Sequence, residues 1–575
     1  MKNRILTLAY VLSIFIFWAF IHPESISYQE QYQLFLFDYD YLSERVSIVG
    51  GIANYIAEFV TQFYYINVVG ALLLTVLYFV LQQVTLKVIK IVAPENNYIA
   101  LSFLPGMLMI AHMGDENVLL SFLVSVIIAT EAFVLLYKLP QNKRLYAEIV
   151  VIPFIYWIAG PVVFVLCLLL SVADIIAKYS KRSLVTICCR IIYTVLSVKI
   201  LSYILMSQYP WPDVWFGVNY HRDHLVYPKM QFVVELIVAM LPLIAVLLQQ
   251  IKYKLADIVI SLVVFFIGIY GAIKCYDTDK YVQIKYDYWV RNEKWNNILN
   301  SAKKYMPRTS LACNSVNLAL AMKGELNDRM FEYFQCGAKG LLATFERNMV
   351  SCVPTAEAYF RIGLTNQALR CFFDSQEAIL NGQKSGRMEK RIAECYIIKG
   401  NYQIAQRHLS LLKKTLFYSN WAHEAEQCIK SETSVNNHPL YGRMRKMRPT
   451  EHIIFSQNDI SALLAKMYEK NSNNKLAFSY MMANIMLQCD IQQFYYVSSW
   501  LKGRTIPRHC QEMIAMFWLQ NIALTDLEPS EEMKRLVKSY DTAFLLTNDK
   551  NKILKSKKWG TTYWAYCTIV APTLN

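Results

Sequence analysis

The sequence contains thirteen cysteines, but they form no CxxC pair and show no metal-ligand spacing. Cys188 and Cys189 are adjacent within an apolar run, and the others are scattered among apolar positions that are typical of helices. A domain that depends on disulfides has a denser and more regular cysteine framework. We therefore expect buried free thiols, and neither a disulfide framework nor a metal site built on cysteine.

A signal-peptide cleavage site is also absent. No small-residue cleavage motif follows the first apolar run, residues 5–21, so this run is expected to stay as a membrane anchor. Apolar runs of roughly 16 to 23 residues recur up to Tyr276, and such runs are long enough to cross a bilayer of about 30 Å. From residue 277 to the end, the composition is that of a soluble domain. The sequence thus predicts a transmembrane domain at 1–276 and a soluble domain at 277–575.

The apolar runs predict about nine transmembrane helices. The fifth and sixth share one hydrophobic block, which is interrupted at Gly160-Pro161 because proline cannot continue a helical hydrogen-bond ladder. The predicted spans are 4–22, 66–88, 98–113, 117–137, 147–159, 161–178, 184–206, 231–249 and 256–275.

The charges beside these spans predict the topology. The net charge is +15, and much of the basic excess lies in loops that fall on one side of the membrane. These basic residues are Lys2, Arg4, Lys87, Lys90, Lys138, Lys143, Arg144, Lys178, Lys181, Arg182, Lys252 and Lys254. Since positive loops stay inside, we expect a cytoplasmic N-terminus in a bacterial inner membrane and a periplasmic C-terminal domain. The lipid bilayer is thus the expected partner of the basic residues, and nucleic acid is not.

The soluble part shows a repeating pattern. The segments "AEAYFRIGLTNQALRCF" (356–372) and "AECYIIKGNYQIAQRHL" (393–409) share small, aromatic and glycine residues at equal offsets, and Gly324, Gly363 and Gly400 are 39 and 37 residues apart. The pattern resembles tetratricopeptide repeats, in which small residues let two antiparallel helices approach and the glycine ends the first helix. A non-repeating helical bundle is the alternative. The fold class is all-α either way, and stacked helical pairs offer a concave surface for partners.

A basic stretch, "YGRMRKMRP" (441–449), is expected to lie in a loop between repeats. It is either a solvated loop or a contact for an anionic lipid or glycan.

Acidic side chains collect in the loops predicted to lie outside the membrane. Asp38 and Asp40 lie in the first loop, 23–65, and Asp115 and Glu116 lie in the turn 114–116. Each pair is explained either by an ordinary hydrated loop or by a task in catalysis. Glycosyl transfer from a lipid phosphate needs a carboxylate to accept the acceptor's proton and a cation for the departing phosphate. Asp38 or Asp40 are candidates for the base, and their two-residue spacing leaves one of them for a divalent cation.

Candidates for binding the donor lie mainly in the loop 207–230. This loop reads "SQYPWPDVWFGVNYHRDHLVYP" between residues 207 and 228, and its aromatic residues suit both the membrane surface and sugar stacking. Lys199 in the seventh span adds a charge that needs a partner. The candidate substrate- and phosphate-binding residues are Lys199, Trp211, Trp215, His221, Arg222 and His224.

The N-terminal part resembles the GT-C glycosyltransferases. The similar features are the long first loop with acids, the acidic turn in "GDENVLLSFLVSVII" (114–128) and the Gly-Pro turn in "WIAGPVVFVLCLLL" (157–170). Ala159 stands where members of that family often have lysine before the Gly-Pro pair. The resemblance implies a polyprenyl-phosphate-linked sugar as donor, with Asp38, Asp40, Asp115 and Glu116 as catalytic residues. The whole chain is also similar to uncharacterised Bacteroidota membrane proteins.

Two functional hypotheses follow. The first is a glycosyltransferase that acts on the outer face of the inner membrane, with the repeats positioning the acceptor. The second is a non-catalytic scaffold whose repeats recruit envelope proteins. A transporter is disfavoured, because the spans carry few polar residues and show no inverted repeat.

The predicted topology can be tested directly. A reporter fused after Tyr276 should be active only outside the cytoplasm, and a cysteine introduced at Pro140 should react only with reagents inside the cell. A cytoplasmic signal from the reporter would contradict the predicted orientation.

Overall fold

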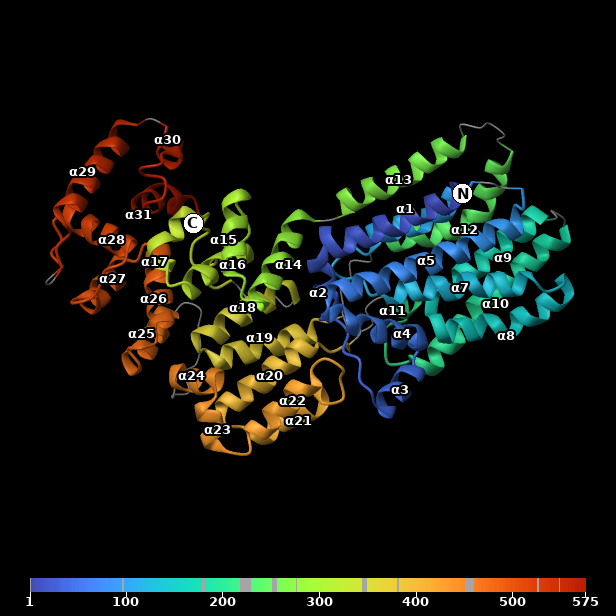
Figure 1. The fold of residues 1–575 in the computed structure, drawn as a ribbon, viewed down its shortest axis with the longest axis horizontal. Coiled ribbons are helices and arrows are strands. Elements are labelled where there is room, and N and C mark those ends of the chain that lie inside the picture. Colours follow the sequence, from blue (N-terminus) through green and yellow to red (C-terminus); the bar gives the residue numbers. More distant parts are fainter. Residues whose placement is uncertain are drawn as a thin grey trace. The chain divides into compact units, whose positions relative to one another are not determined.

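The structure is a computed structural model (Figure 1). It describes residues 2–95, 98–177, 181–217, 229–250, 256–275, 277–343, 349–379, 382–449, 460–524, 527–547 and 549–574. These residues are helical almost throughout, and their one β pairing is an isolated bridge between Cys336 and Ala338. The all-α prediction is confirmed.

The chain divides into two compact units. Unit 1 comprises Met1–Asp277, Ile379–Arg387 and Ser410–Ala422, and unit 2 comprises Thr278–Ala378, Met388–Leu409 and His423–Asn575. The division after Asp277 lies next to the boundary predicted from composition. The two later stretches of unit 1 fall inside the range that the sequence assigned to the second domain.

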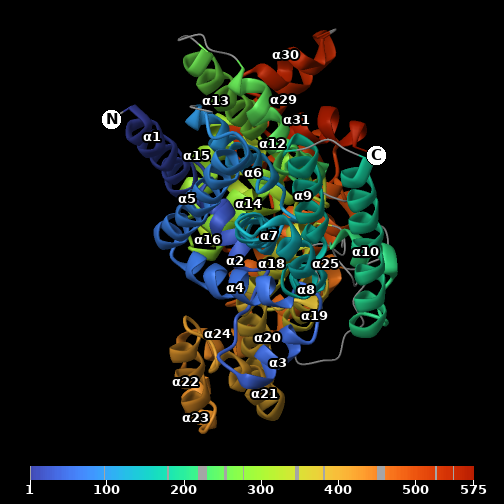
Figure 2. The same cartoon turned by 90° about the vertical axis from the view of Figure 1, so that its right-hand side faces the viewer.

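Apolar helices form the body of unit 1 and pack side by side as a bundle (Figures 1 and 2). They are α1 (Lys2–Ile16, continued by Phe17–Ile21), α5 (Asn67–Val92), α6 (Leu104–His112), α7 (Ser121–Tyr137), α8 (Gln141–Ala159), α9 (Val163–Ala177), α10 (Lys181–Leu205), α12 (Lys229–Gln249) and α13 (Ala256–Cys275). Six segments in the described part are long and apolar enough to span a membrane. The predicted spans 98–113 and 117–137 appear as the shorter apolar helices Ile99–His112 and Ser121–Tyr137. The chain therefore fits a multi-pass membrane protein, and the count of nine spans stays a prediction.

The predicted interruption at Gly160-Pro161 is confirmed. Gly160 has φ +70°, a backbone conformation that glycine adopts readily, and α8 ends directly before it. Arg144 in the first turn of α8 forms an ion pair with Asp174 near the end of α9. The two helices are therefore antiparallel, and the Gly160 turn reverses the chain.

Buried ion pairs join α8, α9 and α10. The Arg190 guanidinium donates to Glu148 at 2.8 Å and to Asp174 at 2.7 Å. Each of these charges has a partner of opposite sign, as buried charges require.

Loop 23–65 forms short helices that pack on the bundle. They are α2 (Pro23–Glu30), α3 (Tyr39–Val46), α4 (Gly51–Thr61) and a 3-10 turn at Gln62–Tyr65. α4 contacts α7 and α8. The Gly50 N–H donates to the Trp157 carbonyl at 2.8 Å, and the Trp157 indole N–H donates to the Val46 carbonyl at 2.8 Å.

Further contacts bring the other predicted outer loops to the same place. A Cβ atom on Gly160 would lie 3.6 Å from the Cα of Gly50, and one on Gly217 would lie 2.9 Å from the Cδ of Pro161. The Gln29 amide donates to the Met113 carbonyl at 3.3 Å. We call the place where 23–65, 113–117, the Gly160 turn and 211–217 meet the loop end. Its position on the outer membrane face stays a prediction.

Unit 2 is built mainly from helices joined by short turns. Its helices, some of which extend into the two later stretches of unit 1, are α14 (Thr278–Arg291), α15 (Trp295–Lys304), α16 (Ser310–Met322), α17 (Leu326–Arg329), α18 (Met349–Ile362), α19 (Thr365–Glu377), α20 (Gly386–Lys399), α21 (Tyr402–Leu412), α22 (Ser419–Cys428), α23 (Glu432–Asn437), α24 (Pro439–Met447), α25 (Ile460–Lys470), α26 (Lys475–Gln488), α27 (Ile491–Val497), α28 (Arg508–Leu519), α29 (Glu531–Leu546), α30 (Lys550–Lys555) and α31 (Tyr563–Ala565).

The three predicted glycines end helices in the same way. Gly324, Gly363 and Gly400 have φ values of +74°, +102° and +82°. The residue after each glycine donates its N–H to a carbonyl five positions earlier, at 2.8 to 2.9 Å. This bond defines a Schellman turn, in which glycine supplies the left-handed residue. The predicted helix ends at these glycines are therefore confirmed.

Three residues other than glycine make the same turn. Glu293, Cys489 and Asn521 have φ values of +55°, +53° and +58°, and each is followed by the same five-residue hydrogen bond at 2.8 to 3.0 Å. A search of the sequence for glycine misses these turns.

Ala368 and Ala405, which stand at equal offsets in the two aligned segments and are predicted packing positions, are fully buried. The turns therefore recur along unit 2, and the likeness to tetratricopeptide repeats stays a prediction.

The expectation of a loop at 441–449 is wrong for most of that stretch. Residues 441–447 lie in α24, and Arg445 on this helix binds neighbouring groups of unit 2. Its guanidinium donates to the Ile397 carbonyl at 2.9 Å and to the Tyr402 hydroxyl at 2.7 Å, and it also pairs with Glu432.

The helix-ending turns allow a stability test with a built-in control. A left-handed residue other than glycine costs about 1–2 kcal/mol. At Gly324 nothing lies within 4 Å of an added Cβ, whereas at Gly363 the Met447 backbone lies 3.2 Å away. We expect Gly363→Ala to lower the thermal unfolding temperature of the detergent-purified chain clearly more than Gly324→Ala. Equal losses would contradict the close approach to Met447.

Candidate functional site

Asp38 and Asp40 lie at the start of α3. Asp38 precedes the helix, and its half-buried carboxylate pairs with the Lys414 ammonium. The Phe37 N–H donates to the Lys414 carbonyl at 2.8 Å, which fixes this pairing. The hydrogen bond from Lys414 lowers the pKa of Asp38. Asp40 is exposed in the first turn of α3.

Asp115 and Glu116 lie half-buried in the turn between α6 and α7. The Asn117 backbone N–H donates to Asp115 Oδ1 at 2.8 Å, and the Asn117 side-chain amide donates to Glu116 Oε1 at 3.3 Å. The first bond is typical of a turn in which an aspartate side chain caps the backbone two residues later. The turn therefore holds both carboxylates in a defined position at the loop end.

The predicted binding residues are more scattered. Lys199 is exposed on α10. Trp211 and Trp215 lie on α11 (Trp211–Phe216), with their rings edge to face and the ring centroids 5.9 Å apart. The ring centroid of Trp215 also lies 4.8 Å from that of Phe164. His221, Arg222 and His224 lie outside the described residues.

The described part of the chain contains no cluster of side chains that could bind a divalent cation. There, no three or more His, Cys, Asp or Glu side chains are grouped so that they could hold a metal ion. The candidate acids, all of which are described, therefore do not form such a group, and we derive no step through a metal.

The structure adds two acids that sequence reasoning missed. Glu24 and Glu30 lie on α2 and are only 7% and 4% exposed. α2 lies against the acidic turn, because its Gln29 bonds to Met113. The Tyr418 hydroxyl donates to Glu30 Oε1 at 2.7 Å. In the sequence these acids stand directly after the first span, in "HPESISYQE", but no local pattern marks them as buried.

A buried cation lies beside the same helix. Arg387 is 4% exposed and donates to the side-chain oxygen of Gln31, the residue that follows α2, at 3.0 Å. Arg387 and Tyr418 belong to the two later stretches of unit 1. The loop end thus combines residues that are more than 350 positions apart in the sequence.

A second buried network centres on Glu58 of α4. This carboxylate is fully buried and accepts hydrogen bonds from Tyr41, from Arg45 at 2.9 Å and from Gln383 at 2.5 Å. Arg45 also donates to Gln383 at 2.8 Å. Burial raises the pKa of Glu58, while the Arg45 charge and the three hydrogen bonds act in the opposite direction. Arg45 also pairs with the exposed Glu44 at 3.3 Å. The network is therefore a structural element that joins α3, α4 and 379–387.

Taken together, the six membrane-length apolar segments of the described part and the acids at the loop end fit a multi-pass membrane protein that has buried polar groups at one end. The chain belongs to the family of unknown function DUF6057, whose model matches residues 1–569. No curated protein and no solved structure matches it.

The Glu58 network predicts a large and pH-dependent loss of stability when its cation is removed. Arg45→Met leaves a buried carboxylate without its charge partner, which costs about 3 kcal/mol or more. The pKa of Glu58 then rises further in the folded state, so the remaining stability should fall as the pH increases through that raised value. Thermal unfolding between pH 5 and pH 8 measures both effects.

Lys414→Met is the matched control, because it removes a cation from a partly exposed pair in the same unit. We expect a much smaller loss, since exposed ion pairs contribute little. Similar losses for the two variants would show that the Glu58 network is not what stabilises this region.

Proposed function

We propose that this protein is a membrane glycosyltransferase that takes a sugar from a polyprenyl phosphate, with its active site at the loop end. The observation that carries the proposal is the hydrogen bond between Gln29 and Met113, because it places the acidic helix α2 against the acidic turn 113–117. Glycosyl transfer needs a carboxylate that accepts the acceptor's proton, and this contact brings two acidic segments that can supply it to one place.

Each group has a role in this proposal. A carboxylate of α2 or of the turn accepts the proton of the acceptor hydroxyl as that oxygen attacks the anomeric carbon. The Arg387 guanidinium stabilises the negative charge on the departing lipid phosphate. The sequence suggested Lys199 and Arg222, among others, for this role. Trp211 and Trp215 offer aromatic faces to the sugar or to the membrane surface. Asp38 is less suited than the α2 acids to act as base, because Lys414 lowers its pKa.

The acidic residues supply the test. Glu24→Gln, Glu30→Gln, Asp115→Asn and Glu116→Gln keep size and polarity but remove charge. Loss of a positioned base typically lowers the rate by about 10²–10⁴-fold. In cells whose own gene is deleted, we expect at least one α2 variant and one turn variant to be present at normal levels but to lose the envelope glycan product.

Glu44→Gln is the control in the same loop, because the Glu44 side chain is 68% exposed. It should leave the product unchanged. Normal product from all four test variants would contradict a catalytic loop end.

A second candidate function is a scaffold that recruits envelope proteins through the helical pairs. The buried contacts of Gln383, Arg387 and Tyr418 support it, because they hold the stretches 379–387 and 410–422 firmly within unit 1. This function predicts that the four acid variants keep the wild-type phenotype, while a deletion within unit 2 that preserves membrane insertion abolishes it.

A further inference from the structure

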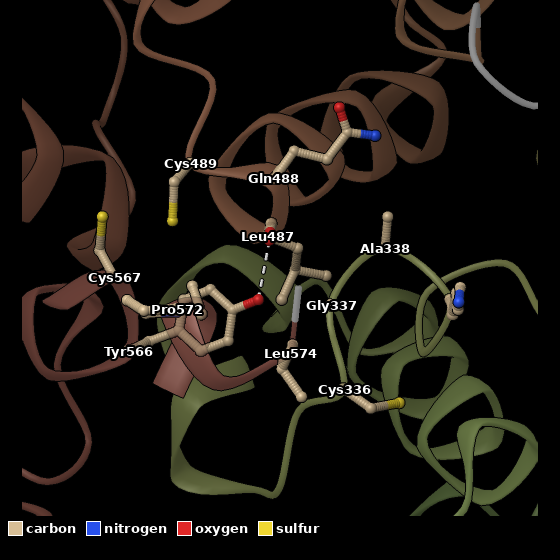
Figure 3. Close-up of a pocket in the computed structure, with 12 residues that line it drawn as sticks. Cys336, Gly337, Ala338, Leu487, Gln488, Cys489, Tyr566, Cys567, Pro572 and Leu574 are labelled. Carbon is tan, nitrogen blue, oxygen red and sulfur yellow. Dashed lines mark hydrogen bonds between the residues drawn. The ribbon is translucent and has the colours of Figure 1, made fainter. Parts of the chain in front are cut away.

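Unit 2 contains a cavity of about 460 Å³ that three cysteines line (Figure 3). Cys336 lies in the segment after α17, Cys489 directly follows α26, and Cys567 lies in the turn of helix after α31. The Tyr566 hydroxyl donates to the Leu487 carbonyl at 2.8 Å and so joins two walls of the cavity. A cavity of this volume is in the range of small-molecule sites.

Two of these cysteines form a pair. Cys489 and Cys567 lie together on one side of the cavity, apart from Cys336 (Figure 3). Both residues are partly exposed, and each is the main cause of the pKa shift of the other. The neighbouring Cys489 thiol, supported by the Tyr563 hydroxyl, lowers the pKa of Cys567 to about 7, although burial opposes this shift. The same interaction raises the pKa of Cys489.

The backbone of Cys489 gives an independent reason to assign it a role. Cys489 has φ +53° and ends α26 at a turn where Gly324, Gly363 and Gly400 stand in other helices. Glycine would avoid the steric cost of this conformation. The strained cysteine places its thiol beside Cys567, which is the kind of strain that functional sites retain.

We propose that Cys489 and Cys567 form a thiol–disulfide couple that exchanges with a low-molecular-weight disulfide entering this cavity. The proposal does not rest on the glycosyltransferase function. It fits the predicted location of unit 2 outside the cytoplasm, where disulfides persist.

The exchange proceeds in two balanced steps. The Cys567 thiolate attacks one sulfur of the incoming disulfide, so that a mixed disulfide forms and one small thiolate leaves. The Cys489 thiol then gives up its proton, and its sulfur attacks the Cys567 sulfur and releases the second small thiolate. The protein loses two electrons and two protons, and the small disulfide gains them as two thiols.

A second pair provides a comparison within the same unit. Cys313 is buried and donates its thiol hydrogen to the Phe334 carbonyl at 3.3 Å. Its proximity lowers the pKa of Cys336, which lines the cavity. Cys336 has an ordinary negative φ, since it is not among the left-handed residues. We assign the exchange to Cys489 and Cys567, because both of their side chains line the cavity whereas Cys313 does not.

The test uses the full chain in detergent, equilibrated with mixtures of reduced and oxidised glutathione and then alkylated. Peptide mass spectrometry should detect a reversible Cys489–Cys567 disulfide whose fraction follows the glutathione ratio. Persistent glutathione on Cys567 without this disulfide, or a disulfide only between Cys313 and Cys336, would overturn the proposal.

Cys489→Gly separates chemistry from folding, because glycine suits φ +53° and the variant should remain folded. Without the neighbouring Cys489 thiol, the pKa of Cys567 should return toward the usual value near 8.5, and its alkylation rate at pH 7 should fall about tenfold or more. Cys313→Ser should leave that rate unchanged. An unchanged rate in Cys489→Gly, with normal thermal unfolding, would contradict the pairing.

Discussion

The loop end depends on the need to satisfy one buried carboxylate. Glu58 of α4 is fully buried, and an unpaired charge in that position would cost several kcal/mol. Tyr41 and Arg45 reach it from α3, and Gln383 reaches it from a stretch more than 300 residues later. Satisfying Glu58 therefore fixes the first loop and brings 379–387 into unit 1. Arg387, which lies in that stretch, reaches the end of α2 as a consequence.

The close approach of two glycines complements this network. Gly50 and Gly160 both have left-handed backbones and lie against each other, so α4 can rest on the turn between α8 and α9. With α4 seated there and α2 held by Met113, the first loop covers the end of the bundle. Gln29, on the same helix as Glu24 and Glu30, thereby bonds to Met113 at the start of the turn 113–117. The catalytic role proposed for these acids needs such a preformed arrangement.

Sequence reasoning found the features that are encoded locally. The Gly160-Pro161 pair ends α8 through the positive φ of Gly160, and Gly363 and Gly400 end helices through their own backbone freedom, so both predictions were confirmed. Burial that depends on distant residues was missed. The residues around Glu24 and Glu30 in the sequence do not indicate that the Tyr418 hydroxyl contacts Glu30. The left-handed turns at Glu293, Cys489 and Asn521 were missed because the residues at these positions are not glycine. The Asp38–Lys414 pair could not be predicted, because the two residues are 376 positions apart in the sequence.

The most direct test of a catalytic loop end is turnover by the purified full chain. The protein, in lipid nanodiscs, would be incubated with a polyprenyl phosphate that carries a radiolabelled hexose, together with envelope extract as acceptor. A catalytic loop end predicts release of free polyprenyl phosphate and transfer of label to the acceptor, and loss of both when Glu24, Asp115 and Glu116 are neutralised together. Equal release by the wild-type protein and this triple variant, or transfer that continues without these charges, would contradict it.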